Sequence, residues 1–155
     1  MDDASFILPH LLVGRAPLTP DDVASLKRRG VTAVLCLQTD EDLAALGLAW
    51  ARLKEWYDAA GVEAHHLPIE DWSPQAVIAR MDEAVQAVRR LLRRGHVLYL
   101  HCTAGANRSP SIALAYLCKV QGEPMERALS RIIRCRPQAA PYPEVLEALR
   151  LARGA

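Results

Sequence analysis

The stretch HVLYLHCTAGANRSPSIALAYLCKV, residues 96–120, decides the fold of this chain. His96 to Leu100 form a short apolar run of the kind found in a buried strand. From Ser109 to Val120 the apolar residues instead follow the spacing of a helix that is buried on more than one side. Small residues fill the segment between the two. The stretch therefore predicts a buried strand, a tight loop and a buried helix, which is a building unit of an α/β fold.

The rest of the chain repeats this alternation of short apolar runs and helical patterns. Two helix starts are marked by a capping residue followed by proline, at Thr19-Pro20 and at Ser73-Pro74. The pattern predicts an α/β fold with a largely parallel sheet. Further strands are expected at residues 11–13, 31–37 and 62–67, and helices at residues 20–30, 40–61, 74–95, 109–120, from 124 and at 143–153.

Length, composition and charge favour a soluble globular protein. With 155 residues and no linker, the chain is expected to form a single domain over residues 1–155. Nineteen basic against eighteen acidic residues leave a charge of +1, so no nucleic acid or membrane partner is expected. No apolar run approaches the length of a membrane span, and Met1-Asp2-Asp3 lacks the features of an export signal. These features leave the oligomeric state open.

The cysteines indicate an intracellular protein without a metal. Cys36, Cys102, Cys118 and Cys135 are widely spaced and contain no Cys-x-x-Cys pair, which argues against a zinc site or a disulfide scaffold. We expect a reducing cytoplasm, no metal and no organic cofactor. Cys36, Cys118 and Cys135 are interpreted as core residues. Whether Cys36 or Cys118 serves as a resolving thiol for Cys102 cannot be decided from their positions in the sequence.

The loop between the strand and the helix has the features of a phosphate-binding site. Cys102 and Arg108 stand six positions apart, in a Cys-x5-Arg pattern. A loop of small residues can turn successive backbone N–H groups inward, and the following helix adds the positive end of its dipole. Such a concavity prefers a phosphate dianion. The residues expected to bind it are Thr103, Ala104, Gly105, Ala106, Asn107 and Arg108.

The same loop supplies the groups for nucleophilic catalysis. The N–H groups and the arginine favour the thiolate of Cys102, which is a nucleophile for phosphoryl transfer. Arg108 presents a planar fork of donors that can follow the phosphoryl oxygens into the transition state. Ser109 is placed to donate a hydrogen bond to the sulfur as it leaves. His101 is expected to fix the loop through hydrogen bonds.

Expelling an alkoxide also needs a general acid. Glu70 and Asp71, just before the Ser73-Pro74 helix start, are the carboxylates that could approach Cys102 from another loop. We favour Asp71, which Trp72 could shield from water so that a proton stays available. The alternatives are that Glu70 is the acid, or that Asp71 only stabilises the helix start.

The run from His101 to Pro110 resembles the active-site motif of the dual-specificity branch of protein tyrosine phosphatases. Family members carry the acid loop about thirty residues before the cysteine, as Asp71 does, and end with a helix after a turn like Arg136-Pro137. The resemblance covers most of the chain. It implies a three-layer fold with a mostly parallel five-stranded sheet flanked by helices, and a cysteine-dependent phosphatase.

Within that family, two segments are most similar to plant starch phosphatases and laforin. They are residues 12–23 and the stretch from Cys36 to Leu43. This likeness implies a phosphoglucan substrate. The chain departs from that group at Asn107, where a second glycine is usual, and at Ala44-Ala45-Leu46, where aromatic residues are usual.

The residues therefore leave several functions open. We expect hydrolysis of phosphotyrosine, phosphoserine or phosphothreonine in proteins through a phosphocysteine intermediate. The first alternative is the same chemistry on a phosphorylated carbohydrate or another small phosphorylated ligand. The second is a module that binds a phosphorylated partner without turnover, and the presence of both Cys102 and Arg108 disfavours it. A sulfurtransferase or arsenate reductase is disfavoured by Arg108 and the spacing of Asp71.

Overall fold

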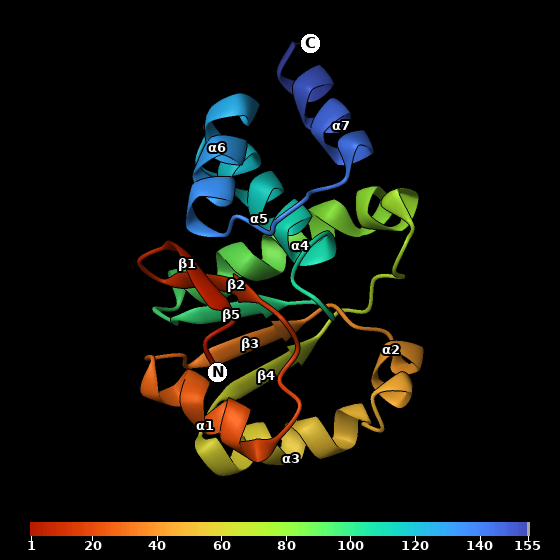
Figure 1. Cartoon of the computed structure of the whole chain (residues 1–155). Helices are drawn as coiled ribbons and strands as arrows, with labels where there is room; N and C mark the ends of the chain where they lie inside the picture. Colours follow the sequence, from red (N-terminus) through yellow and green to blue (C-terminus); the bar gives the residue numbers. More distant parts are fainter. Residues whose placement is uncertain (155) are drawn as a thin grey trace.

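Five strands pair into one sheet in the order β1-β2-β5-β3-β4 (Figure 1). The computed structural model describes the backbone of residues 1–154 and the side chains of residues 1–152. All neighbouring strands are parallel except β1 and β2, which are antiparallel. This arrangement confirms the expected mostly parallel five-stranded sheet. The strands are β1 (Ala4–Leu8), β2 (Leu11–Gly14), β3 (Ala33–Cys36), β4 (Glu63–His66) and β5 (Leu98–His101).

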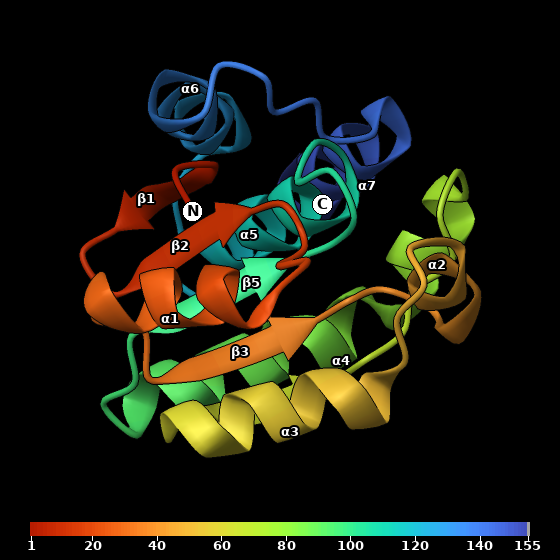
Figure 2. The same cartoon turned by 60° about the horizontal axis from the view of Figure 1, so that its bottom comes forward.

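Helices cover both faces of the sheet and complete the three layers. Figures 1 and 2 show α1 and α3 on one face and α4 to α7 on the other. The short α2 stands beyond the end of β3. The helices are α1 (Pro20–Arg28), α2 (Asp40–Ala45), α3 (Trp50–Ala60), α4 (Pro74–Arg93), α5 (Arg108–Lys119), α6 (Met125–Cys135) and α7 (Pro143–Gly154).

Side chains of the central strands alternate between two hydrophobic cores. In β5, Leu98 and Leu100 join the core formed with α4, α5, α6 and α7, whereas Tyr99 joins the core formed with α1 and α3. β3 divides its side chains in the same way. Because both faces of β5 are covered, the strand is apolar at nearly every position, as expected for the middle of a parallel sheet.

The structure adds one strand to the expected elements and changes the bounds of others. The first strand, β1, was not expected, because its apolar residues do not alternate cleanly and Phe6 is exposed. The helix expected over residues 40–61 is two helices, since Gly47 takes a left-handed conformation between α2 and α3. Leu43 and Leu53 are both fully buried, so each short helix has its own contact with the core. The strands expected at residues 31–37, 62–67 and 96–100 are Ala33–Cys36, Glu63–His66 and Leu98–His101 in the structure.

The carboxyl ends of β2, β3 and β5 meet at one edge of the sheet, because these strands are parallel. The loops that follow them, at residues 15–19, 37–39 and 102–107, therefore lie together. In open α/β sheets this edge is where ligands bind. It is also the edge that carries the Cys-x5-Arg loop.

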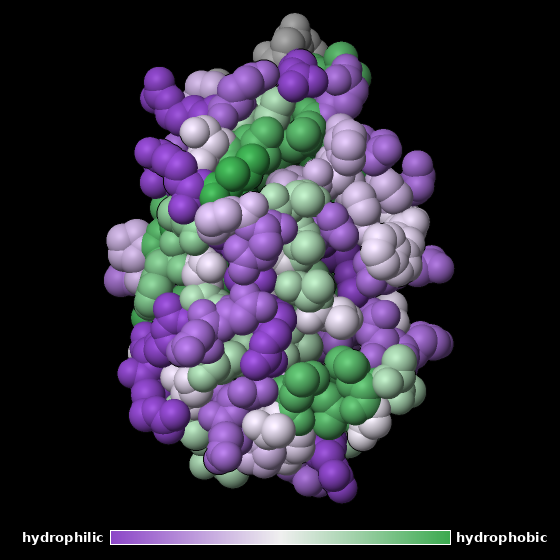
Figure 3. Space-filling view, in the orientation of Figure 1, coloured by the Kyte–Doolittle hydropathy of each residue, from purple (hydrophilic) through white to green (hydrophobic). Residues whose placement is uncertain are grey.

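Polar and apolar side chains are mixed over the surface. On the face that Figure 3 shows, most of the surface is polar or neutral, and apolar surface gathers near α6 and α7 and again in the lower part of the view, beside α2. None of the helices in the described part of the chain is both long enough and apolar enough to cross a membrane.

Candidate active site

Cys102 lies at the base of a small cleft between β5 and α5. Its side chain is buried, and its sulfur lies 3.3 Å from the hydroxyl oxygen of Ser109 in the first turn of α5. The amino-terminal end of α5 therefore faces the sulfur, and the helix dipole favours negative charge there. The cleft has a volume of about 160 Å³ and is lined by Asp71, Trp72, Cys102, Thr103, Ala104, Ala106, Asn107 and Arg108.

Gly105 allows the loop to curve tightly. Its φ of 69° lies in the left-handed region, where side chains are strained. A Cβ atom at this position would lie 2.4 Å from the backbone of Gly14 and 2.6 Å from the guanidinium of Arg136. Both the backbone conformation and the space therefore require glycine.

Arg136 holds the outer side of the loop. Its guanidinium is fully buried and donates to the carbonyl oxygens of Gly105 at 2.7 Å and Ala104 at 3.1 Å. An ion pair of 2.6 Å to Asp3 balances its charge. With the loop carbonyls bound on this side, the N–H groups are free to face the cleft. The sequence indicated a turn at Arg136-Pro137 but not this contact, because it joins residues about thirty positions apart.

Three further segments fix the loop from behind. Ala16 donates its N–H to the carbonyl of Thr103 at 3.0 Å, and the Gln38 side chain donates to the Thr103 hydroxyl at 3.1 Å. On the other side, Ala140 donates to the carbonyl of Ala106 at 2.7 Å, and the Asn107 side chain donates to the carbonyl of Ala140 at 2.7 Å. Asn107 thus ties the loop to the segment before α7. It is the position at which the starch phosphatases were expected to have a glycine.

His101 is a buried neutral residue that supports the loop. Its Nδ1 lies 3.0 Å from the carbonyl oxygen of Cys102, and because a carbonyl only accepts, Nδ1 carries the proton. Burial lowers the pKa of His101 to about 4. The ring stacks on Tyr99, and no described residue donates to Nε2. This geometry suits a positioning residue and leaves no role in proton transfer at neutral pH.

Arg108 gathers the charged groups of the site. Its side chain is 1% exposed, and Nη1 donates to Asp42 at 2.6 Å and to the carbonyl of Ile69 at 2.9 Å. Nη2 donates to the hydroxyl of Thr103 at 3.2 Å and lies 3.2 Å from Asp71. Burial opposes the charged form, but the hydrogen bond to Asp42 and the charges of Cys102, Asp71 and Asp42 together outweigh it and raise the pKa of Arg108.

Asp42 is a site residue that sequence reasoning missed. It stands in the first turn of α2, where it accepts from the N–H of Thr39 at 3.0 Å and forms a capping box with that residue. Burial would raise the pKa of Asp42, but the hydrogen bonds from Arg108 and Thr39 outweigh burial and lower it. The capping box was a visible signal, since Thr39 is followed three positions later by an acid. The contact with Arg108 was not.

The structure brings Asp71, and not Glu70, into the cleft. One oxygen of Asp71 faces Arg108, and the other accepts from the N–H of Trp72 at 2.9 Å. The hydroxyl of Tyr142 lies 3.5 Å from that second oxygen and accepts from the N–H of Trp72 at 3.1 Å. Tyr142, from the start of α7, was not expected at the site. Glu70 is exposed and lines the neighbouring groove.

The Trp72 side chain points into solvent and does not shield Asp71 from water as expected. Its side chain is 81% exposed, and Asp71 retains 26% exposure. Arg108 and Tyr142 hold the carboxylate of Asp71 instead. Trp72 also has a φ of 58°, a conformation that costs about 1–3 kcal/mol for a bulky residue and that occurs mainly at functional sites.

The remaining cysteines, Cys36, Cys118 and Cys135, lie outside the Cys-x5-Arg loop. Cys36 is buried in β3 beside His101 of β5, and burial raises the pKa of its thiol to about 12. Cys118 and Cys135 lie in α5 and α6. Among the described residues no group of three histidine, cysteine or acidic side chains is placed to hold a metal ion.

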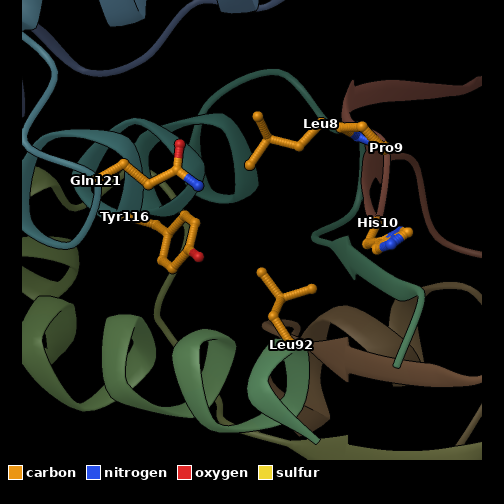
Figure 4. Close-up of a pocket in the computed structure, with 6 residues that line it drawn as sticks. All are labelled: Leu8, Pro9, His10, Leu92, Tyr116 and Gln121. Atoms are coloured by element: carbon orange, nitrogen blue, oxygen red, sulfur yellow. The ribbon is translucent and has the colours of Figure 1, made fainter. Parts of the chain in front are cut away.

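A separate hollow lies on the other side of the molecule, near the turn between β1 and β2 (Figure 4). Its volume is about 270 Å³, larger than that of the cleft at Cys102. It contains none of the expected site residues, so we place the candidate site at the smaller cleft. The lining residues are Leu8, Pro9, His10, Leu92, Tyr116 and Gln121.

Known proteins with similar sequences and structures are phosphatases. The chain is 36% identical over 124 residues to the phosphoglucan phosphatase DSP4, amyloplastic, of Castanea sativa, covering 76% of this chain and 32% of that protein. It is 30% identical over 144 residues to laforin of Mus musculus, covering 86% and 44%. The solved structure of PTPMT1 in complex with PI(5)P has a TM-score of 0.80 and 27% identity, covering 99% of this chain and 100% of that one. The active form of Tk-PTP has a TM-score of 0.80 and 28% identity, covering 97% of each chain.

The chain spans 32% and 44% of the length of these two curated relatives, the phosphoglucan phosphatase and laforin. Residues 19–153 match the family described as dual specificity phosphatase, catalytic domain. That range includes the cysteine loop, Asp42 and Asp71. The chain therefore belongs to the family of dual specificity phosphatase catalytic domains.

Proposed function

We propose that this protein hydrolyses phosphate monoesters through a phosphocysteine intermediate on Cys102. The observation that carries the proposal is one cleft in which the sulfur, the guanidinium of Arg108 and the carboxyl of Asp71 lie together at the amino-terminal end of a helix. These three groups supply a nucleophile, charge stabilisation and a proton.

In the first step, the thiolate of Cys102 attacks phosphorus. A sulfur–phosphorus bond forms, the bond between phosphorus and the ester oxygen breaks, and Asp71 gives its proton to the departing oxygen. Arg108 and the loop N–H groups bind the three remaining phosphoryl oxygens. Asp42 keeps the guanidinium in place through its 2.6 Å ion pair with Nη1. The other nitrogen, Nη2, then lies on the side of the phosphate-binding loop, where it donates to Thr103.

In the second step, water attacks the phosphocysteine. The carboxylate of Asp71 takes a proton from the water, the sulfur–phosphorus bond breaks, and inorganic phosphate leaves. Ser109 donates its hydroxyl hydrogen to the sulfur, 3.3 Å away, and so stabilises the returning thiolate. No step uses a metal, so a chelator is expected to leave the rate unchanged, and a strict metal requirement would contradict the mechanism.

The substrate we propose is a phosphorylated protein, since the cleft is small and opens to the surface at Trp72. A phosphoglucan is the second candidate, and the similarity to the phosphoglucan phosphatase of Castanea sativa supports it. We place the reaction in a reducing compartment, the cytoplasm, because a catalytic thiolate is readily oxidised in an oxidising compartment.

Phosphate release tests the proposal with three substrates measured side by side. They are para-nitrophenyl phosphate, a phosphotyrosine peptide and a solubilised phosphoglucan, each with wild type and with Cys102→Ser. We expect turnover by wild type and none by the variant. Appreciable turnover by Cys102→Ser would refute the nucleophile. Release from the glucan at a rate rivalling the peptide would make the glucan the favoured substrate, and release from none of the three would favour the binding module.

A further inference from the structure

The catalytic cleft continues into a wider groove. The cleft and the groove share Asp71 and Trp72, so the groove begins on the side where the leaving group departs. Its volume is about 500 Å³, within the range of ligand-binding clefts. The groove therefore offers space for the group that is attached to the phosphate. The lining residues are Thr39, Glu41, Asp42, Glu70, Asp71 and Trp72.

The groove is acidic on the side away from the cleft. Glu41 and Glu70 are exposed, and no ion pair joins them to any side chain that the structure describes. Among the residues lining the cleft and the groove, Arg108 is the one that carries a positive charge. A bound phosphate dianion engages that charge. The groove then presents uncompensated carboxylates to the rest of the substrate.

Trp72 adds an aromatic surface at the boundary between cleft and groove. Its side chain is 81% exposed, while hydrogen bonds from its N–H to Asp71 and Tyr142 fix its backbone. A cation that lies over an indole face is attracted to it, in addition to the carboxylates nearby. The neutral side chains of Thr103, Ala106 and Asn107 on the opposite wall offer an anion no such attraction.

We propose that this groove selects phosphopeptides that carry an arginine or lysine beside the phosphorylated residue, and that it disfavours esters with a second negative charge. The inference rests on the proposed function, because it concerns the leaving-group side of the same site. Each exposed ion pair of this kind changes an equilibrium by up to about fivefold, so Glu41 and Glu70 together predict a preference on the order of tenfold.

Matched phosphotyrosine peptides test the proposal. They differ at the flanking positions, which hold arginine, alanine or aspartate, and kcat/KM is measured for wild type and for the double variant Glu41→Gln and Glu70→Gln. We expect wild type to prefer the arginine peptide over the aspartate peptide by about tenfold at low salt, and less at high salt. In the double variant the ratio should fall toward one. Glu55→Gln, an exposed acid on α3 outside the groove, is the matched control and should keep the wild-type ratio.

A ratio near one in wild type, or a ratio that the double variant leaves unchanged, would overturn the proposal. The proposal would also be overturned if the flanking charge had no effect on wild type and wild type hydrolysed phosphoglucan faster than any peptide. Failure of the proposed function has a different signature, which is no release from para-nitrophenyl phosphate. In that case the affinity of Cys102→Ser for the same peptides still measures the charge preference.

Discussion

At the scale of single residues, Arg108 connects the two carboxylates of the site. Asp42 and Asp71 contact different nitrogens of the guanidinium, at 2.6 and 3.2 Å. Asp42 is held by its own helix cap, so it fixes the guanidinium, whereas Asp71 stands in a loop beside the cleft. Because their surroundings differ, we propose different roles for the two carboxylates, positioning for Asp42 and proton transfer for Asp71.

Replacing Asp42 by asparagine separates its charge from its shape. Asp42→Asn keeps an acceptor for the Thr39 N–H but removes the ion pair to Arg108. Hydrogen bonds to charged groups contribute about 1.5–3 kcal/mol, so we expect kcat/KM for para-nitrophenyl phosphate to fall by about 10- to 100-fold. Asp40→Asn, an exposed neighbour in the same helix turn, is the control and should change little. Equal effects of the two substitutions would show that Asp42 does not position Arg108.

Replacing Asp71 by asparagine tests proton transfer. Asp71→Asn should lower turnover by about a hundredfold or more for a phosphoserine peptide, whose alkoxide needs a proton, and far less for para-nitrophenyl phosphate. Glu70→Gln is compared on the same two substrates because Glu70 is adjacent but lies outside the cleft, and alanine flanks the phosphoserine so that the proposed charge preference of the groove does not enter. An equal loss on both substrates would point away from a general acid at Asp71, and a larger loss in Glu70→Gln would assign that role to Glu70.

At the scale of elements, the catalytic loop is held by segments from both ends of the chain. Asp3, before β1, pairs with Arg136, and Arg136 binds the loop carbonyls. Gly105 curves against the backbone of Gly14, at the end of β2. The chemistry of the loop could be predicted from residues 101–109 alone. Its support could not, because sequence patterns report contacts along one helix or strand and these contacts join distant segments.

Arg136→Lys tests this support without removing the buried charge. One ammonium cannot reach the carbonyls of Ala104 and Gly105 and the carboxylate of Asp3 together in the planar pattern of a guanidinium. We expect weaker binding of vanadate, by about tenfold, and slower alkylation of Cys102 by iodoacetate at neutral pH. Arg134→Lys, at an exposed arginine two positions earlier in the chain, is the control. Unchanged vanadate affinity in a folded Arg136→Lys protein would contradict the positioning role.

At the scale of the whole molecule, burial explains which parts of the fold could be predicted from the sequence and which could not. Strands such as β3 and β5 are covered on both faces, so their continuous apolar runs were visible in the sequence. β1 is an edge strand with a register shift between Phe6 and Leu8, and its pattern is weak. The break at Gly47 was missed because the residues on either side of it continue a helical pattern. Trp72 was expected to cover Asp71, but its outward direction depends on a left-handed backbone that no pattern encodes.

His101 links the stability of the whole fold to pH, because it is buried in the last position of the central strand β5. Burial lowers its pKa from 6.5 to about 4, so between these values the unfolded chain binds a proton that the folded protein does not. The free energy of unfolding therefore falls as the pH falls through this window, by about 3 kcal/mol in total. Asp42, whose pKa is lowered, adds a further loss of stability at more acidic pH.

Urea unfolding between pH 7 and 4 measures how steeply the free energy of unfolding changes with pH. This slope should be smaller in His101→Asn and unchanged in His10→Asn, which replaces an exposed histidine. The same slope in wild type and His101→Asn would mean that another group takes up the proton.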